Sequence, residues 1–214
     1  MAGSSQDDSG GVAAALPSER VNTPRAIVLR TLFVYGPMMA EEALVALLGR
    51  VPTKRPATLV GHVRCCKVGH AQQPGVCSTH RSLVRSGYPA VAKSEVHKVE
   101  GILLERLRPQ EMSIFDYYED SAYNRQLVKL TAENGFGGHE EVESLCYVWP
   151  SSRIDELDMG ASWEYPQFRT SNMNAFIQEV IQPCRRRFES EQGALEEVMT
   201  AREMQRTDRS QRGS

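Results

Sequence analysis

The sequence lacks the features that mark several protein classes. Its 214 residues contain no run of 18 or more apolar residues, so it predicts no membrane-spanning helix. The first residues carry Asp7 and Asp8 and no apolar segment, which argues against a secretory signal and a mitochondrial presequence. The net charge of -2 gives no general attraction to nucleic acid or to an anionic membrane. We therefore expect a cytoplasmic protein that binds neither nucleic acid nor membrane.

Cysteine is scarce, and its count is odd. Five cysteines cannot form a complete disulfide framework, so reduced thiols are the simpler interpretation. Cys77 and His80 have a spacing that zinc tolerates, but no Cys-x-x-Cys pair occurs, and Cys65 and Cys66 should point to opposite faces of a strand. We expect no metal, with zinc as the open alternative for the Cys and His residues of this region: His62, Cys65, Cys66, His70, Cys77 and His80.

The polar residues are concentrated at the two ends of the chain. Residues 1–24 are rich in Gly, Ser, Ala and Asp without an apolar period, which is typical of a disordered tail. Residues 184–214 are strongly charged, and their few apolar residues at helical spacing predict a partly helical tail. We therefore expect one packed domain over residues 25–183.

Within this domain, β-branched and aromatic runs alternate with short amphipathic segments. A helix is predicted after Gly36-Pro37, where Leu44, Leu47 and Leu48 share a face and Gly49 is a natural stop. A second helix begins at Pro109, and Met173 to Ile181 predict a third. A polar segment over 67–87 is predicted to be a loop. The expected strands are 26–35, 57–66, 99–107, 124–133 and 144–150, which together indicate an α+β domain around one mixed sheet or small barrel.

The second helix carries a glutamate in an unusual place. Met112 and Phe115 define its apolar face, and Glu119 lies seven and four residues beyond them, whereas Asp116 and Asp120 share the solvent face. A carboxyl group shielded by Met, Phe and Tyr loses hydration in its ionised form, so its pKa rises towards neutrality. The pattern therefore indicates a general acid and base. Two alternatives remain open: the helix ends before Glu119, or a nearby arginine pairs with it.

That arginine is Arg125, which follows the predicted helix in "FDYYEDSAYNRQLV". The same stretch, with "LFVYG", "LLGRVP", "YPAV", "VEGILLERL" and "CYVW" in this order, resembles the gamma-glutamylcyclotransferase-like family, in particular its avirulence-induced-gene-like branch. The later "SWEYPQFRTSNMNAFI" is similar to the closing helix of that branch. The resemblance covers roughly residues 31–181.

The resemblance implies a small mixed β-barrel with flanking helices and an activity. Enzymes of the family cyclise a γ-glutamyl amine to 5-oxoproline without metal or cofactor. The family's catalytic glutamate corresponds to Glu119, which would move a proton from the substrate's α-amine to the leaving nitrogen. The implied partner is therefore a small γ-glutamyl molecule.

The resemblance also places a substrate cradle at the turn after the first strand. In the family, backbone N–H groups at this turn hold oxygen atoms of the γ-glutamyl group, and Tyr35, Gly36, Pro37 and Met38 occupy those positions. Tyr123 is expected to supply a hydroxyl, with an ordinary core aromatic as the alternative. The family usually has Ser or Thr where this chain has Pro37, which lacks an N–H and a hydroxyl.

Two further features bear on function. Arg108 stands where a Ser or Thr cap is expected, so the sequence predicts that the second helix begins without its usual cap. In the tail, Leu195, Val198 and Met199 lie at helical spacing and would dock on a protein partner or on the domain, unless the helix is simply solvated. The sequence thus favours a cyclotransferase, with a non-catalytic binding or assembly module of the same fold as the alternative.

Overall fold

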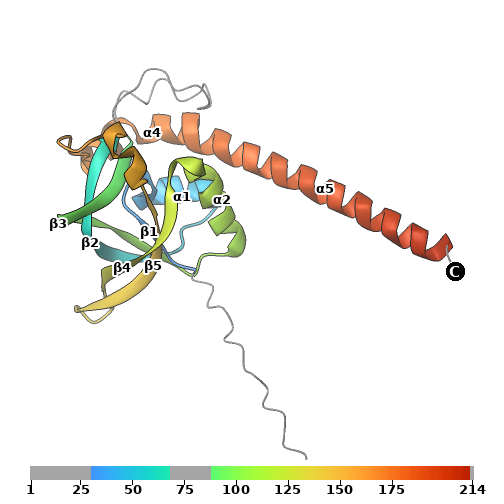
Figure 1. Cartoon of the computed structure of the whole chain (residues 1–214), viewed down its shortest axis with the longest axis horizontal. Coiled ribbons are helices and arrows are strands. Elements are labelled where there is room, and N and C mark those ends of the chain that lie inside the picture. Colours follow the sequence, from blue (N-terminus) through green and yellow to red (C-terminus); the bar gives the residue numbers. More distant parts are fainter. Residues whose placement is uncertain (1–29, 68–87, 213–214) are drawn as a thin grey trace, which may run out of the picture.

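The structure is a computed structural model that describes residues 30–67 and 88–212, with side chains up to Glu203. Five strands close into a barrel (Figure 1), in the order β3-β1-β5-β4-β2, and β2 pairs with β3 to complete the circle. Only the β1–β5 pairing is parallel within the barrel, and the others are antiparallel. The predicted α+β class and small mixed barrel are therefore confirmed. The strands are β1 (Leu32–Val34), β2 (Thr53–Lys67), β3 (Pro89–Glu105), β4 (Asn124–Glu133) and β5 (His139–Val148), and a short β6 (Leu157–Asp158) pairs with the end of β2.

Apolar side chains of all five strands fill the barrel. Phe33 of β1, with an exposed fraction of 1%, packs against Leu59, Leu103 and Leu130. Gly101 leaves room for this ring, because a Cβ there would lie 2.6 Å from Phe33 Cζ and 2.5 Å from the Val34 carbonyl oxygen. The interior is thus a packed core, and a functional site must lie at an end or on the outside of the barrel.

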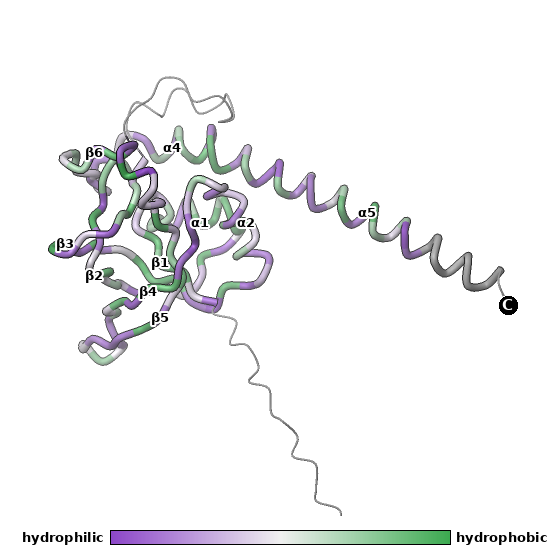
Figure 2. The backbone as a smooth tube through the Cα atoms, in the orientation of Figure 1, coloured by the Kyte–Doolittle hydropathy of each residue, from purple (hydrophilic) through white to green (hydrophobic). Residues whose placement is uncertain are grey.

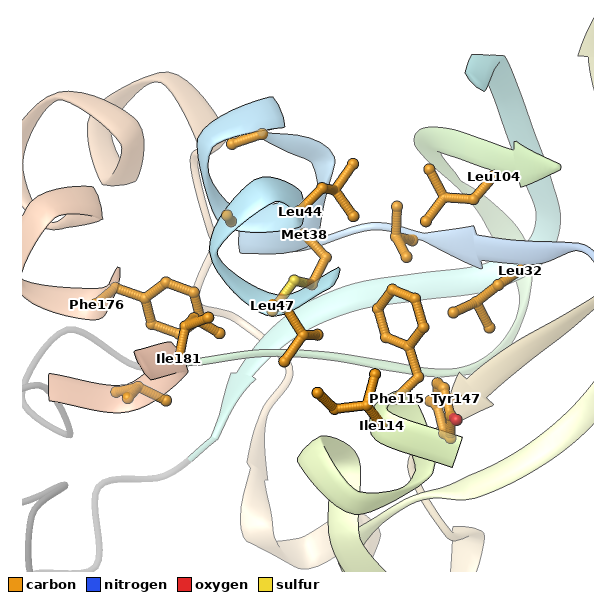
Figure 3. Packing of buried hydrophobic residues seen from close by; sticks show 14 of the residues in the cluster. Leu32, Met38, Leu44, Leu47, Leu104, Ile114, Phe115, Tyr147, Phe176 and Ile181 are labelled. Carbon is orange, nitrogen blue, oxygen red and sulfur yellow. The ribbon is translucent and has the colours of Figure 1, made fainter. Parts of the chain in front are cut away.

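Helices pack against one side of the barrel and form a second core (Figure 3). Phe115 and Ile114 of α2 meet Leu47 of α1, while Phe176 and Ile181 close the cluster from the C-terminal helices. The helices are α1 (Glu41–Leu48), α2 (Pro109–Glu119), α3 (Tyr165–Ser171), α4 (Met173–Phe176), a π-helical turn (Ile177–Ile181) and α5 (Gln182–Arg212); short 3₁₀ turns cover Pro37–Met39, Asp120–Ala122 and Ser151–Glu156.

The predicted α2 helix is present, and its N-cap residue Arg108 makes no side-chain cap hydrogen bond, as expected where the usual Ser or Thr is missing. The Arg108 N–H donates a hydrogen bond of 2.7 Å to the side chain of Glu111, which lies at the third helical position. Arg50 donates two further hydrogen bonds to the same carboxylate, at 2.5 and 2.6 Å. The carboxylate at the third helical position thus reaches back to the N–H of the N-cap residue, which is the contribution of the acidic residue in a capping box.

Element boundaries differ most at strand ends. The strand expected over 26–35 is observed as β1 from Leu32, and residues 26–29 lie outside the described residues. The strand expected over 99–107 begins already at Pro89, so the first half of β3 was not predicted. Lys67, which was expected in the loop, is the last residue of β2. The remainder of that loop, 68–87, lies outside the described residues, as does the expected tail over 1–24.

Helix α5 extends well beyond the barrel (Figure 1). Its first turns contact α2, where Tyr117 donates a 2.9 Å hydrogen bond to Glu191 and its ring lies 5.4 Å from that of Phe188. Farther out, hydrophilic and hydrophobic residues alternate (Figure 2), and Leu195, Val198 and Met199 are about half exposed. The helix crosses residue 183, and the domain boundary expected there stays a prediction. Over the described residues, no helix is both long and apolar enough to span a membrane.

Candidate active site

Glu119 is the last residue of α2, and it lies on the face that the sequence predicted. The helix does not end at Tyr118. Met112 and Phe115 are buried on the same face, while Asp116 and Asp120 are exposed. Asp120 has a φ of 56°, which is rare for a residue other than glycine, and it ends the helix directly after the glutamate.

The carboxyl group of Glu119 is half-buried among tyrosines at one end of the barrel. Burial raises its pKa from 4.5 to about 7, and the positive charge of Lys67 opposes this rise. Glu119 in turn contributes to raising the pKa of Tyr35, Tyr118 and Tyr123, after the larger effect of their burial. Within the described part of the chain, its carboxylate accepts no hydrogen bond, so it is able to exchange a proton near neutral pH.

Arg125 does not pair with Glu119. Its guanidinium donates to both carboxylate oxygens of Asp116, at 2.7 and 2.5 Å. Tyr147 lies opposite Arg125 in the β4–β5 ladder, and its hydroxyl also donates to Asp116, at 2.7 Å. The strand register therefore directs Arg125 to the solvent-facing carboxylate, and the alternative of a structural Glu119–Arg125 pair is wrong.

The cation of this site, Lys67, was not predicted from the sequence. Its ammonium nitrogen lies 4.5 Å from the ring centres of both Tyr123 and Trp149. Burial lowers the pKa of Lys67 to about 8, and the charge of Glu119 opposes this shift. These residues are distant in sequence and come together at the ends of β2, β4 and β5, so no local spacing indicates the cluster. Its only sequence signal is a lysine at the end of an apolar strand.

The turn after β1 contains two backbone N–H groups that form no hydrogen bond with another described residue. Pro37 is buried at the first position of a 3₁₀ turn, where a missing N–H costs no hydrogen bond within the turn. The Met39 N–H donates to the Gly36 carbonyl oxygen at 3.0 Å. The N–H groups of Gly36 and Met38 have no hydrogen-bond partner among the described residues. The predicted cradle thus retains two donors despite Pro37.

The side chains around this turn hold it in place. Tyr35 donates from its hydroxyl to the Tyr147 carbonyl oxygen at 2.7 Å, and its own carbonyl oxygen accepts from Arg64 at 2.8 Å. Gly36 lies against Pro89, where a Cβ would approach the proline ring to 2.9 Å. Tyr123 donates to the Pro89 carbonyl oxygen at 3.2 Å, so its hydroxyl is engaged in the structure and its role as a donor to substrate stays a prediction.

Of the six residues of the zinc alternative, His62, Cys65 and Cys66 lie among the described residues, and the alternative stays open. In the described ranges, no group of three or more His, Cys, Asp or Glu side chains is placed to hold a metal ion. Cys65 and Cys66 contact different apolar clusters, as expected for neighbours in a strand, and burial raises the pKa of Cys65 to about 11, which disfavours the thiolate that zinc requires. His70, Cys77 and His80 lie outside the described residues.

Two cavities lie apart from Glu119. One of about 530 Å³ is lined by residues around the loop that joins β3 to α2, among them Arg106 and Arg108. The other, of about 930 Å³, is lined by residues of β2 and β3 and by Trp163 and Tyr165. Neither is lined by Glu119. Because proton transfer requires contact with the titratable group, we place the candidate site at Glu119 and not at the larger spaces.

Comparison with known proteins identifies the family of this fold. The model of the family described as gamma-glutamyl cyclotransferase, AIG2-like, matches residues 32–165. AIG2-like protein D of Arabidopsis thaliana is 25% identical over 151 residues, which cover 71% of this chain and 86% of that protein. AIG2-like protein C of the same plant is 26% identical over 146 residues, which cover 68% and 73%.

The solution structure of an A. thaliana protein is 24% identical to this chain, with a TM-score of 0.47, and the match covers 72% of this chain and 89% of that one. The family model alone matches well over half of the chain. The chain therefore belongs to the AIG2-like gamma-glutamyl cyclotransferase family.

Proposed function

We propose that the protein is a γ-glutamyl cyclotransferase that releases 5-oxoproline from a γ-glutamyl amine or dipeptide. The observation that carries this proposal is the half-buried Glu119, whose pKa burial raises to about 7. Its charge helps to raise the pKa of Tyr35, the residue that precedes the Gly36-Pro37 turn, after the larger effect of the burial of Tyr35. Membership of the family supports the same chemistry, and the amine half of the substrate stays open.

The reaction needs one proton carrier. The substrate's neutral α-amine attacks the γ-carbonyl carbon, and Glu119 accepts the proton that this nitrogen loses as the new C–N bond forms. The bond between the γ-carbon and the leaving nitrogen then breaks, and Glu119 returns the proton to that nitrogen. The products are 5-oxoproline and the free amine, and neither water nor an oxidant is consumed. A group with a pKa near neutrality serves both steps.

Backbone donors would stabilise the oxygen that becomes negative during attack. The N–H groups of Gly36 and Met38 project from a turn that side-chain contacts hold rigid, and fixed donors of this kind need no reorganisation in the transition state. Pro37 between them contributes no donor. We therefore assign the γ-carbonyl oxygen to this turn, with fewer contacts than a serine or threonine turn would provide.

The decisive experiment compares two neighbouring carboxylates. Purified protein is incubated with γ-glutamyl dipeptides and γ-glutamyl-lysine, and 5-oxoproline is measured. Glu119→Gln should lower kcat by roughly 10²- to 10⁴-fold, the usual contribution of a general acid and base. Asp120→Asn removes the next, exposed carboxylate of the same turn and should retain activity. Equal activity of Glu119→Gln and the parent would refute the assigned mechanism.

The alternative is a binding or assembly module of the same fold. The buried Pro37 at the cradle favours it, because a missing hydrogen bond to a charged group weakens binding by about 1.5–3 kcal/mol. The exposed Leu195, Val198 and Met199 of α5 would then meet a protein partner. Absence of turnover on every substrate, together with binding of 5-oxoproline, would favour this alternative.

A further inference from the structure

Lys67 carries a positive charge that acts on Glu119, and no described side chain forms an ion pair with it. Its ammonium lies over Tyr123 and Trp149, both at 4.5 Å from the ring centres. The described residues provide neither an ion pair nor a hydrogen bond for this ammonium. It influences the pKa of Glu119, but the two side chains are not in ion-pair contact. As far as the described residues go, all three of its N–H donors are available to a ligand.

The other cations of this region are already engaged. Arg153 also lies over Trp149, at 4.5 Å, but it forms an ion pair with Glu156 at 2.7 Å. Arg125 is held by Asp116. Arg64 donates to the Tyr35 carbonyl oxygen and lies 5.5 Å from the ring centre of Trp163. Lys67 is thus the cation of the described site that is best able to bind an anionic group.

Its surroundings also keep Lys67 in one place. Its backbone pairs with Leu157 of β6, and its N–H donates to the Tyr88 carbonyl oxygen at 3.3 Å. The Trp149 indole N–H donates to the Arg153 carbonyl oxygen at 2.7 Å, and the rings of Tyr123 and Trp149 meet edge to face at 5.1 Å. A charged side chain that is partly removed from water needs such contacts, because cation–π attraction offsets only part of the missing hydration.

The chemistry of the substrate indicates which of its groups the Lys67 ammonium would bind. In a γ-glutamyl compound, the α-amine and the α-carboxylate are attached to the same carbon atom. If Glu119 reaches the α-amine, the α-carboxylate must lie close to Glu119 as well, where the two negative charges would repel each other. We propose that Lys67 binds the α-carboxylate of the substrate and so supplies the recognition that the Pro37 turn provides only weakly. This inference rests on the proposed function, because it takes the α-amine to be the group at Glu119.

Product binding tests this role without requiring turnover. L-5-Oxoproline and L-5-oxoprolinamide differ only in a carboxylate or a neutral carboxamide, and their affinities are measured by titration calorimetry. The parent should bind 5-oxoproline about 10- to 150-fold more tightly, as expected for one charge-assisted hydrogen bond of about 1.5–3 kcal/mol. Lys67→Met should abolish this preference, and Lys67→Arg should retain part of it. Lys129→Met, which removes an exposed lysine of β4, should leave the preference unchanged.

The outcomes separate this inference from the proposed function. If Lys67→Met weakens both ligands equally, or if the parent shows no preference, Lys67 does not bind the carboxylate and the inference is wrong. Lys67→Gln is a second uncharged variant in case Lys67→Met fails to fold. If the preference depends on Lys67 but no substrate is turned over, the inference stands and the catalytic proposal fails. If substrate is turned over but the preference for the carboxylate does not depend on Lys67, the catalytic proposal stands and the inference is wrong.

Discussion

The burial of Glu119 should make the free energy of unfolding fall as pH rises, and Glu119→Gln should remove this contribution. Its pKa rises from 4.5 in the unfolded chain to about 7 in the native state. The native state therefore binds this proton more tightly. The group's contribution to stability is fully present below the unfolded pKa, and it is lost as pH rises through the folded pKa.

The magnitude follows from the two pKa values. At about 1.4 kcal/mol per pKa unit, the ionised carboxylate costs about 3 kcal/mol of stability at high pH. Between about pH 5.5 and about pH 7.5, the two-state titration gives a loss of about 2 kcal/mol. The upper value lies below the lowered pKa of Lys67, about 8, so the ammonium stays mostly charged in both measurements.

Urea denaturation of the parent and of Glu119→Gln at the two pH values measures this difference. From the lower to the higher pH, the free energy of unfolding of the variant should rise by about 2 kcal/mol relative to that of the parent. The reason is that glutamine does not ionise, so the variant is spared the cost of a buried carboxylate. Any change in packing that the substitution causes cancels in this comparison, since it does not depend on pH. Asp120→Asn controls for loss of a charge at this end of the helix. If the free energies of unfolding of variant and parent differ by the same amount at both pH values, Glu119 is not desolvated. The reason for assigning proton transfer to Glu119 would then disappear.

Two further predictions concern the turn after β1. Gly36→Ala should lower stability by about 1–3 kcal/mol and reduce kcat/KM, because the added Cβ would lie 2.9 Å from the Pro89 ring; thermal denaturation and the 5-oxoproline assay measure both effects. Gly135→Ala, where no atom lies within 4 Å of the added Cβ, is the matched control, and equal effects of the two changes would refute close packing at Gly36. Pro37→Ser restores an N–H and a hydroxyl that can bind the substrate or the oxygen that becomes negative, so it should raise kcat/KM by about 10-fold or more. An unchanged kcat/KM would show that the turn does not hold the γ-carbonyl oxygen.

The sequence determined the features that depend on neighbours along the chain. The spacing of Met112, Phe115 and Glu119 places the glutamate on the buried face of α2, and the helix indeed continues that far. The strand over 124–133 was predicted with the same bounds as β4, and Gly49 ends α1 in a left-handed conformation, as expected for a glycine stop. The resemblance to the family identified Pro37 as a departure from the family's usual turn.

Interactions between distant segments were not predictable in this way. The sequence suggested Glu119 as a partner of Arg125, and the β4–β5 register, which places Arg125 opposite Tyr147, decided for Asp116. The capping role of Glu111 depended on the side chain of Arg50, which belongs to another part of the chain. In both cases the partner is set by strand and helix packing.

The sequence by itself thus determined the fold class, the position of Glu119 in line with the apolar face of α2 and the unusual turn at Tyr35, because periodicity and turn chemistry act over a few residues. That the helix continues to Glu119 and that its carboxyl group is half-buried were decided by the tertiary structure. Only the tertiary structure decided what surrounds the glutamate. Lys67, Tyr123 and Trp149 meet because closure of the barrel brings the ends of β2, β4 and β5 together. A lysine that looks like the beginning of a solvated loop in the sequence is therefore a half-buried charge beside the candidate acid, since burial is set by the whole barrel and not by adjacent residues.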